Sequence, residues 1–274
     1  MILLHSMATP ELDPAGLLAL TADLGLDGIE LVVQHGYRCA LPPDAPLAAA
    51  ATLRDQAGAL GLSVGGLVPY AKGQNHPDPC VRRAAVAELA HAVRLAAAAG
   101  APVVRVFAGE AVAEQDWNRA RDDLADALRE LSGIAADTGV TLAVENHMDT
   151  MATTAARTME IVRAVGHPAT GVLFDPANLV LMQAEPPLDA LAIQAAAIRH
   201  VHVKDMAWVG GQRRAALPGA GVVPWPDLVA TLRAQGYAGA WSLEYEARWF
   251  PDELPPARSG AAAAVAYLRN LLPC

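Results

Sequence analysis

The sequence predicts an α/β protein built as a single (β/α)8 barrel, the TIM-barrel architecture, in one domain over residues 1–274. Short apolar segments of strand length alternate along the whole chain with longer segments of helical spacing. Eight such pairs fit into 274 residues, close to the length that this barrel needs. An open doubly wound sheet usually has a glycine-rich phosphate turn after its first strand, and the segment after His5 has none.

The eight predicted strands are short apolar runs, several of which end at a charged or polar residue. They are expected at Ile2–His5, Gly28–Val33, Ser63–Val68, Val103–Phe107, Thr141–Glu145, Thr170–Asp175, His200–Lys204 and Ala240–Glu244. Side chains alternate between the two faces of a strand. The flanking valines therefore predict that Arg105 points into the barrel, where a buried guanidinium needs a carboxylate partner.

The predicted helices are alanine- and leucine-rich, and six of them end at a glycine just before the next strand. They are expected at Pro10–Leu24, Ala45–Leu60, Pro79–Ala99, Asp116–Thr138, Thr153–Val165, Leu188–Ala197, Trp225–Gln235 and Ser259–Leu271. The glycines are Gly25, Gly61, Gly100, Gly139, Gly166 and Gly236. Glycine adopts the left-handed conformation that closes a helix, so this placement is typical of αβ turns.

Composition excludes several classes of protein. Apolar residues make up 53% of the chain and charged residues 18%, so the chain can bury a large core and is not expected to be disordered. No apolar run is long enough for a membrane span, and the N-terminus lacks the basic start of a secretory signal. The net charge of −9 argues against a nucleic-acid partner. Cys39, Cys80 and Cys274 are scattered, which favours a reducing cytoplasm.

Reactive side chains stand at the ends of the last four predicted strands. These are Glu145 on strand five, Asp175 on strand six, His200, His202 and Lys204 on strand seven, and Glu244 on strand eight. The loops that follow the strands of such a barrel open at one rim, so these groups are expected to converge. Three carboxylates would repel one another there without a cation between them. The pattern predicts one divalent metal ion: the oxygen-rich donor set favours Mn²⁺, Mg²⁺ or Co²⁺, and Zn²⁺ is also compatible.

The spacing of strand seven leaves one choice open. His200 and His202 lie on the same face of the strand, so alternation alone does not select which imidazole joins the carboxylates.

Several short motifs occur in a distinctive order: "DGIEL", "VEN", "FDPAN", "HVHVKD", "GAGVVPWPDLVATLRAQGYAG" and "WSLEYE". In these the chain resembles the sugar isomerase/epimerase superfamily with a xylose-isomerase-like barrel, which includes ketose 3-epimerases, hydroxypyruvate isomerase and inosose dehydratase. The resemblance implies a metal on Glu145, Asp175, His202 and Glu244, with Glu145 and Glu244 also acting as the catalytic acid/base pair. It also leaves a homo-oligomer open, because dimers and tetramers are common in these families.

Five further residues are candidates for binding a small keto-sugar or keto-acid substrate: Lys204, Asn178, His147, Glu30 and His5. Alternatives stay open for four of them, and His147 could instead support the ligand on strand five. Lys204 could meet a substrate carboxylate or phosphate, or pair with Asp205 or another carboxylate. Glu30 could form a structural salt bridge, and His5 could be buried in the barrel.

The chain departs from the ketose 3-epimerases at two positions. Those enzymes place a histidine where this chain has Asn178, and an arginine near the stretch 206–209, whereas the nearest arginines here are Arg213 and Arg214. The substrate is therefore open. The sequence favours a metal-dependent isomerase or epimerase that works through an enediolate, and the alternative is a lyase or dehydratase on a related keto-substrate. A binding barrel without catalysis and an apurinic endonuclease are weaker alternatives, the second because the extra histidines of its zinc cluster are missing from strands two to four.

Overall fold

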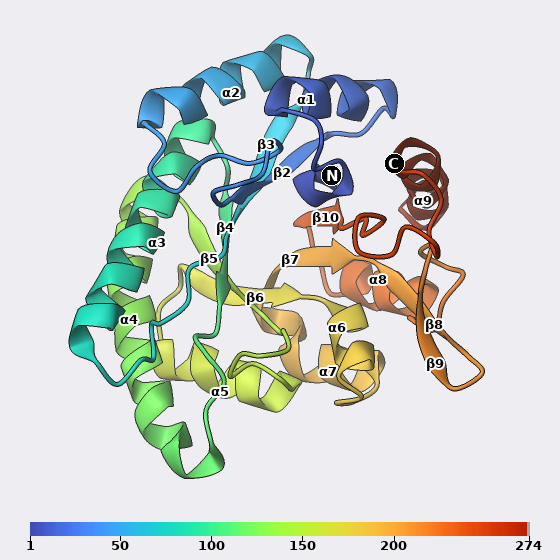
Figure 1. Cartoon of the computed structure of the whole chain (residues 1–274). Coiled ribbons are helices and arrows are strands. Elements are labelled where there is room, and N and C mark those ends of the chain that lie inside the picture. Colours follow the sequence, from blue (N-terminus) through green and yellow to red (C-terminus); the bar gives the residue numbers. More distant parts are fainter. Residues whose placement is uncertain (273–274) are drawn as a thin grey trace.

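The computed structural model describes residues 1–272, which leaves Cys274 outside the described part of the chain. Eight parallel strands close into a barrel, with the neighbours in the order β1-β10-β7-β6-β5-β4-β3-β2 (Figure 1). Their bounds are β1 Ile2–His5, β2 Gly28–Val33, β3 Ser63–Pro69, β4 Val103–Phe107, β5 Thr141–Glu145, β6 Thr170–Phe174, β7 Ile198–Val203 and β10 Ala240–Leu243. The predicted (β/α)8 barrel is confirmed: β1, β2, β4 and β5 have the predicted bounds, and the other four strands differ by one or two residues at one or both ends.

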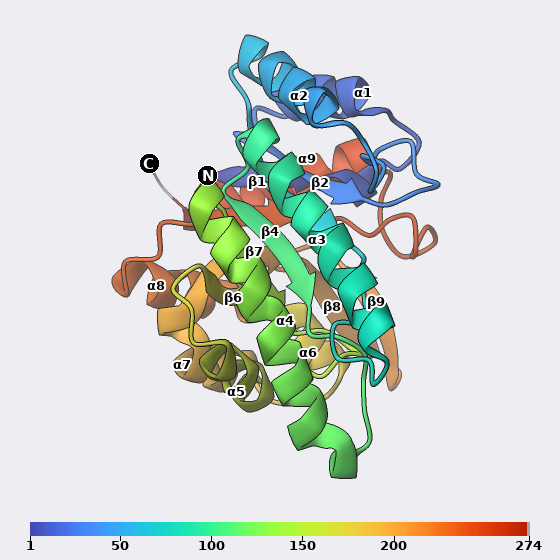
Figure 2. The same cartoon turned by 90° about the vertical axis from the view of Figure 1, so that its left-hand side faces the viewer.

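The helices surround the strands, and α3 and α4 lie side by side over the outside of the barrel (Figure 2). Their bounds are α1 Pro14–Asp23, α2 Leu47–Ala59, α3 Pro79–Ala99, α4 Trp117–Thr138, α5 Ala155–Val165, α6 Pro176–Leu181, α7 Pro187–Gln194, α8 Trp225–Ala234 and α9 Ala257–Leu271. Short 3₁₀ turns cover Ser6–Ala8, Glu114–Asp116 and Ala195–Ala197. Among residues 1–272, no helix has the length and apolar character needed to cross a membrane.

Asp-Pro pairs set where three helices begin, and the sequence analysis predicted the start of α3 at Pro79 but missed the other two. The first helix begins at Pro14 rather than Pro10, because the Asp13 carboxylate accepts a hydrogen bond from the Gly16 backbone N–H at 2.9 Å. Helix α6 was not predicted at all. It begins directly after Asp175, whose Oδ1 accepts from the Asn178 N–H at 2.9 Å. This short helix fixes Asp175 at the end of β6.

The six helix-ending glycines are in the left-handed conformation, as predicted. Their φ angles lie between +63° and +79°. A residue with a Cβ is strained in this region, so these positions stop each helix and direct the chain into the next strand.

An additional hairpin stands outside the barrel, where the sequence analysis expected no strands. Strands β8 (Asp205–Val209) and β9 (Gln212–Ala216) pair antiparallel and project from the end of β7 (Figure 1). The two-residue turn is Gly210-Gly211, with φ of +58° and +78°. Two successive positive φ angles are what a tight hairpin turn requires.

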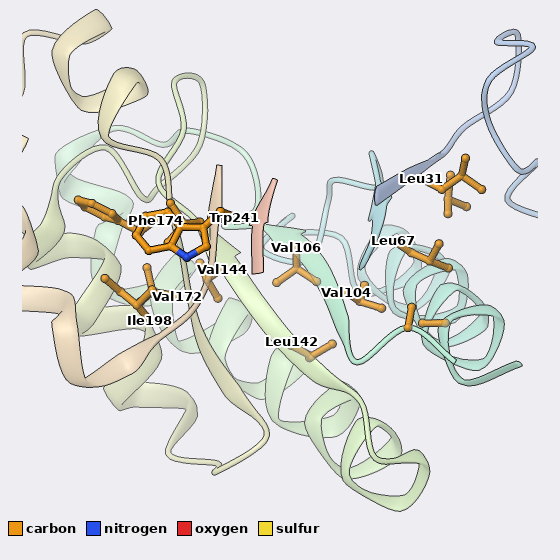
Figure 3. Packing of buried hydrophobic residues seen from close by; sticks show 14 of the residues in the cluster. Leu31, Leu67, Val104, Val106, Leu142, Val144, Val172, Phe174, Ile198 and Trp241 are labelled. Atoms are coloured by element: carbon orange, nitrogen blue, oxygen red, sulfur yellow. The ribbon is translucent and has the colours of Figure 1, made fainter. Parts of the chain in front are cut away.

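The main hydrophobic core lies between the strands and the helices, and Figure 3 shows part of it. Val104 and Val106 of β4 point outward into this core, so Arg105 between them points inward. Burying one side chain of this size contributes about 1.5–3 kcal/mol. Inside the barrel, Val103, Ala143 and Leu173 form a separate small apolar cluster. Buried polar side chains also lie in the barrel, among them His5, Glu30, His200 and His202.

Candidate functional site

Four side chains from adjacent strands converge inside the barrel. Glu145 ends β5, Asp175 follows β6, His202 lies in β7 and Glu244 follows β10. Each offers one carboxylate oxygen or ring nitrogen, and these four atoms all lie within 4.8 Å of one another. We call these four residues the candidate metal cluster. The first three are buried, and the Glu244 side chain is 15% exposed. Buried carboxylates this close together require positive charge among them.

The structure distinguishes the two histidines of β7. The Nδ1 atom of His202 lies 3.4 Å from Oε1 of Glu145 and 3.3 Å from Oε2 of Glu244. His200 instead lies deeper in the barrel, with Nε2 at 3.0 Å from Oε1 of Glu30. Only His202 of this pair therefore reaches the carboxylates at the rim.

Lys204 fills the space among the carboxylates. Its Nζ atom lies 2.8 Å from Oε2 of Glu244, 3.0 Å from Oδ2 of Asp175 and 3.5 Å from Oε1 of Glu246. The sequence left open whether Lys204 binds a substrate or pairs with a carboxylate of the protein. In the structure it pairs with carboxylates, but Asp205 is not one of them. The Asp205 carboxylate instead accepts hydrogen bonds from the backbone N–H groups of residues 206, 219, 221 and 223.

Arg105 supplies a second positive charge next to the cluster. Its Nε atom lies 3.5 Å from Oε2 of Glu145, which confirms that it points inward toward a carboxylate. The guanidinium also stacks over the rings of Tyr70 and Phe107, at 4.5 and 3.8 Å from their centroids. This packing holds Arg105 and, through it, one oxygen of Glu145.

These charges shift the pKa values of the carboxyl groups in opposite directions. Burial alone would raise the pKa of Glu145, but Arg105 and the His202 ring lower it to about 2. Burial raises the pKa of Asp175 to about 6, since Glu244 and Glu145 add to the effect of burial and Lys204 only partly opposes it. Without a metal, Asp175 is therefore the cluster carboxyl that protonates first as the pH falls.

The pKa values of the two cationic groups are raised. Burial alone would lower the pKa of Lys204, but Asp175, Glu244 and Glu246 hold it well above its usual range. The pKa of His202 is likewise held well above its ordinary value, because Glu30 and Glu244 outweigh the effect of burial. The protein thus balances the carboxylates with its own cations when no metal is bound.

Asn146 and Asn178 form hydrogen bonds that connect the segments carrying Glu145 and Asp175. The Asn146 side chain bonds both backbone groups of Asp175: Nδ2 donates to the carbonyl at 2.6 Å and Oδ1 accepts from the N–H at 3.0 Å. Asn178 Nδ2 donates to the Asn146 carbonyl at 3.1 Å and lies 3.4 Å from Oε1 of Glu145. The ends of β5 and β6 are therefore held in one fixed arrangement.

A pocket of about 280 Å³ reaches the cluster at Glu244. His147, Asn178, Lys204, Glu244, Glu246 and Arg213 line its polar side. Trp249 and Phe250 add an aromatic wall, and Arg213 comes from the β8–β9 hairpin. A larger and shallower hollow of about 880 Å³, between Val33 and His91, contains none of the cluster residues.

Of the five predicted substrate-binding residues, the structure brings Lys204, Asn178 and His147 to the pocket. His5 and Glu30 lie fully buried beneath His202 and do not line it. Glu246 and Arg213 line the pocket without having been predicted. The position of Arg213 could have been predicted in part, because the Gly210-Gly211 pair just before it is typical of a hairpin turn.

A search by sequence finds inosose dehydratases, and a search by structure finds proteins of the same barrel fold. The chain is 27% identical over 148 residues to the inosose dehydratase of Bacillus thuringiensis (strain Al Hakam), which covers 48% of each protein. It thus spans about half the length of the curated relatives it matches. The 3-keto-D-glucoside 4-epimerase of E. coli superposes with a TM-score of 0.79 at 18% identity, covering 98% of both chains.

A solved IOLI protein with a bound zinc atom superposes with a TM-score of 0.80 at 19% identity, covering 99% of this chain and 97% of that one. At such low identities these structures demonstrate a shared fold. The match to a family model is broader, since the model described as a xylose isomerase-like TIM barrel covers residues 18–271. Nearly the whole barrel is included in that range. The chain therefore belongs to the xylose isomerase-like TIM barrel family.

Proposed function

We propose that the protein is a divalent-metal-dependent isomerase or epimerase of a small ketose, keto-acid or keto-sugar. The observation that carries this proposal is the convergence of Glu145, Asp175, His202 and Glu244, whose ligand atoms lie within 4.8 Å of one another beside the pocket. Glu145 and Glu244 are the proposed acid/base pair, and all four residues are the proposed metal ligands.

The donor set fits a divalent ion. Three carboxylates and one imidazole are the ligand types of Mn²⁺, Mg²⁺ and Co²⁺, and Zn²⁺ is also compatible. Lys204 contacts Glu244 and Asp175, and Arg105 contacts Glu145, so these two cations reduce the negative charge of the carboxylates. The zinc atom in the similar IOLI protein supports a metal in this type of barrel.

The proposed reaction moves a proton next to a carbonyl group. One glutamate takes the proton from the carbon beside the carbonyl, and the electron pair of that C–H bond forms the C=C bond of an enediolate. A bound divalent ion would supply positive charge that stabilises the enediolate oxygens. The second glutamate, which must carry a proton when the substrate binds, then donates that proton to carbon. Delivery to the opposite face of the same carbon inverts the centre. Delivery to the former carbonyl carbon isomerises the substrate, and the proton of the neighbouring hydroxyl group then moves to the former carbonyl oxygen.

The pocket residues are proposed to hold the rest of the substrate. Asn178 and Lys204 lie next to the acid/base pair and can donate hydrogen bonds to substrate oxygens. His147 packs against Phe107 with ring centroids 4.9 Å apart, which fixes its ring at the pocket wall. Arg213 lies on the hairpin side of the pocket, where it can reach the far end of a small substrate.

A lyase is the second candidate, favoured by the sequence similarity to inosose dehydratases. The first proton transfer would be the same. The enediolate would then expel a hydroxyl group from the next carbon, and the proton held by a glutamate would complete the water that leaves. A dehydratase therefore differs only in the fate of the enediolate.

Solvent exchange separates these outcomes. The protein is incubated with Mn²⁺ and a panel of ketoses, keto-acids and inososes in D₂O, and the products are read by NMR and mass spectrometry. An isomerase or epimerase incorporates deuterium at the carbon beside the carbonyl, whereas a dehydratase yields a product lighter by one water. Glu145→Gln and Glu244→Gln should abolish either reaction, and Glu160→Gln on the surface should not. Full activity in both site variants would refute the proposed acid/base pair.

We also propose that the protein acts on small-molecule substrates, has no nucleic-acid or membrane partner, and is located in the cytoplasm.

A further inference from the structure

We propose that Glu30 is a positioning residue that holds the His202 ring with Nε2–H toward Glu30 and Nδ1 toward the carboxylates. The proposal rests on the proposed function, in which Nδ1 of His202 is a metal ligand. It assigns Glu30 a place beneath the site rather than in contact with the substrate.

Glu30 reaches His202 across the inside of the barrel. Strand β2, which carries Glu30, is separated from β7 by β1 and β10 in the closed barrel. Even so, Oε2 of Glu30 lies 2.9 Å from Nε2 of His202 and accepts a hydrogen bond from the Ser242 hydroxyl at 2.5 Å. Its other oxygen lies 3.0 Å from Nε2 of His200. The Glu30 carboxylate is fully buried and is surrounded by potential donors on three sides.

The barrel wall leaves room for this carboxylate. In β3, the strand next to β2, a Cβ atom added at Gly66 would lie 2.9 Å from Oε1 of Glu30. Even alanine at this position would therefore press against the carboxylate. The glycine and the two hydrogen-bond donors together fix where the Glu30 oxygens lie.

The chemistry of imidazole explains what this position does. A histidine binds a metal through one nitrogen when the proton sits on the other, and a hydrogen bond from the second nitrogen fixes that choice. An ionised carboxylate can only accept, so Glu30 keeps a proton on Nε2 of His202. The second proton of the cationic ring sits on Nδ1, which faces Glu145 and Glu244, and a metal that displaces this proton would bind Nδ1.

A second cation in the barrel is the competing explanation, because His5, Glu30 and His202 also offer ligand atoms within 4.8 Å of one another. Hydrogen bonding argues against it. Nδ1 of His5 accepts a hydrogen bond from the Met7 backbone N–H at 3.2 Å. The proton of a neutral His5 ring therefore sits on Nε2, which leaves no lone pair there for a metal.

The test compares zinc binding by the full chain and its variants. Competition with a chromogenic chelator measures the zinc affinity, and ¹⁵N-edited NMR measures the Nε2–H proton of His202 with and without zinc. Glu30→Gln should weaken zinc binding by about 10–100-fold and remove the far-downfield Nε2–H signal. Ser242→Ala, which removes one donor to Glu30 and changes no charge, should weaken binding less and shift the same signal.

Glu246→Gln is the charge-matched control, because it removes a carboxylate near Lys204 that does not contact His202. It should leave the Nε2–H signal in place. Unchanged zinc affinity and an unchanged signal in both Glu30→Gln and Ser242→Ala would overturn the positioning role. Two zinc ions per chain, one of them lost in Glu30→Gln, would make Glu30 a ligand instead. If the wild type retains the signal but binds no zinc, the metal site of the proposed function fails, and the role of Glu30 toward a metal fails with it.

Discussion

The Nζ atom of Lys204 lies 2.8 Å from Oε2 of Glu244 and 3.0 Å from Oδ2 of Asp175, which makes the lysine a cation within reach of two proposed metal ligands. Lys204→Met would leave these carboxylates without that partner, which typically costs about 3 kcal/mol for a buried pair. We expect the metal-free variant to unfold at a lower temperature than the wild type.

A metal should stabilise Lys204→Met more than the wild type, because the substitution removes a positive charge from the cluster and the metal ion replaces it. Thermal unfolding with and without Mn²⁺ measures both effects. Equal metal-induced shifts in the melting temperatures of Lys204→Met and wild type would contradict this electrostatic account.

Arg213 and Arg214 form a matched pair on the β8–β9 hairpin. Successive side chains of a strand point to opposite faces: Arg213 lines the pocket, and Arg214 bonds Glu253 at 2.9 Å outside it. Arg213→Gln should raise KM by about tenfold, because the substrate loses roughly one hydrogen bond to a charged group. It should change kcat less. Arg214→Gln should leave KM near the wild-type value. Steady-state kinetics on a substrate found by solvent exchange provide the measurement, and equal effects of the two variants would argue against a binding role for Arg213.

Asp205 holds the loop between the hairpin and α8. Its carboxylate accepts four backbone N–H groups, including those of Gly219 and Val223 at 3.0 Å each. Asp205→Ala would leave several donors without their acceptor, so we expect the free energy of unfolding to fall by about 3 kcal/mol. Denaturant unfolding measures this loss. A change within about 0.5 kcal/mol, typical of surface substitutions, would mean that the loop does not depend on this carboxylate.

The buried His5 predicts a pH dependence of stability. Burial lowers its pKa from 6.5 to about 4, although Glu30 and Glu244 oppose the shift. Between these two values the unfolded chain binds a proton that the folded chain does not. The stability conferred by neutral His5 is therefore complete above pH 6.5 and is lost as the pH falls toward 4, by about 3 kcal/mol in total.

His5→Asn removes this titration and keeps an acceptor for the Met7 N–H. Denaturant unfolding of the metal-free proteins across this pH range should give a shallower loss of stability for the variant. Parallel pH profiles for the two proteins would show that His5 does not set this dependence.

The sequence predicted the barrel well because its strands and helix ends are encoded locally. Gly100 and Gly139, for example, mark helix ends with a single residue type that tolerates positive φ. The hairpin was missed because its second strand, Gln212–Ala216, is largely exposed and carries no apolar alternation. The Gly210-Gly211 turn was the sequence feature that could have predicted this hairpin.

The site was predictable in part for a similar reason. Glu145 and Glu244 end their strands, and strand ends of a parallel barrel meet at one rim. Depth inside the barrel was not predictable: alternation indicates that Glu30 points inward, but its layer depends on the register and tilt of the closed sheet. The choice between His200 and His202 has the same origin, since both face inward and only one lies at the level of Glu145.

Metal stoichiometry tests the central claim most directly. Chelator-treated protein is titrated with Mn²⁺ by calorimetry, in the wild type, in Glu244→Gln and in Glu160→Gln as a surface control. The account predicts about one ion per chain in the wild type and the control, and far weaker binding in Glu244→Gln. An absence of binding in the wild type, or equally tight binding in Glu244→Gln, would contradict a metal held by Glu145, Asp175, His202 and Glu244.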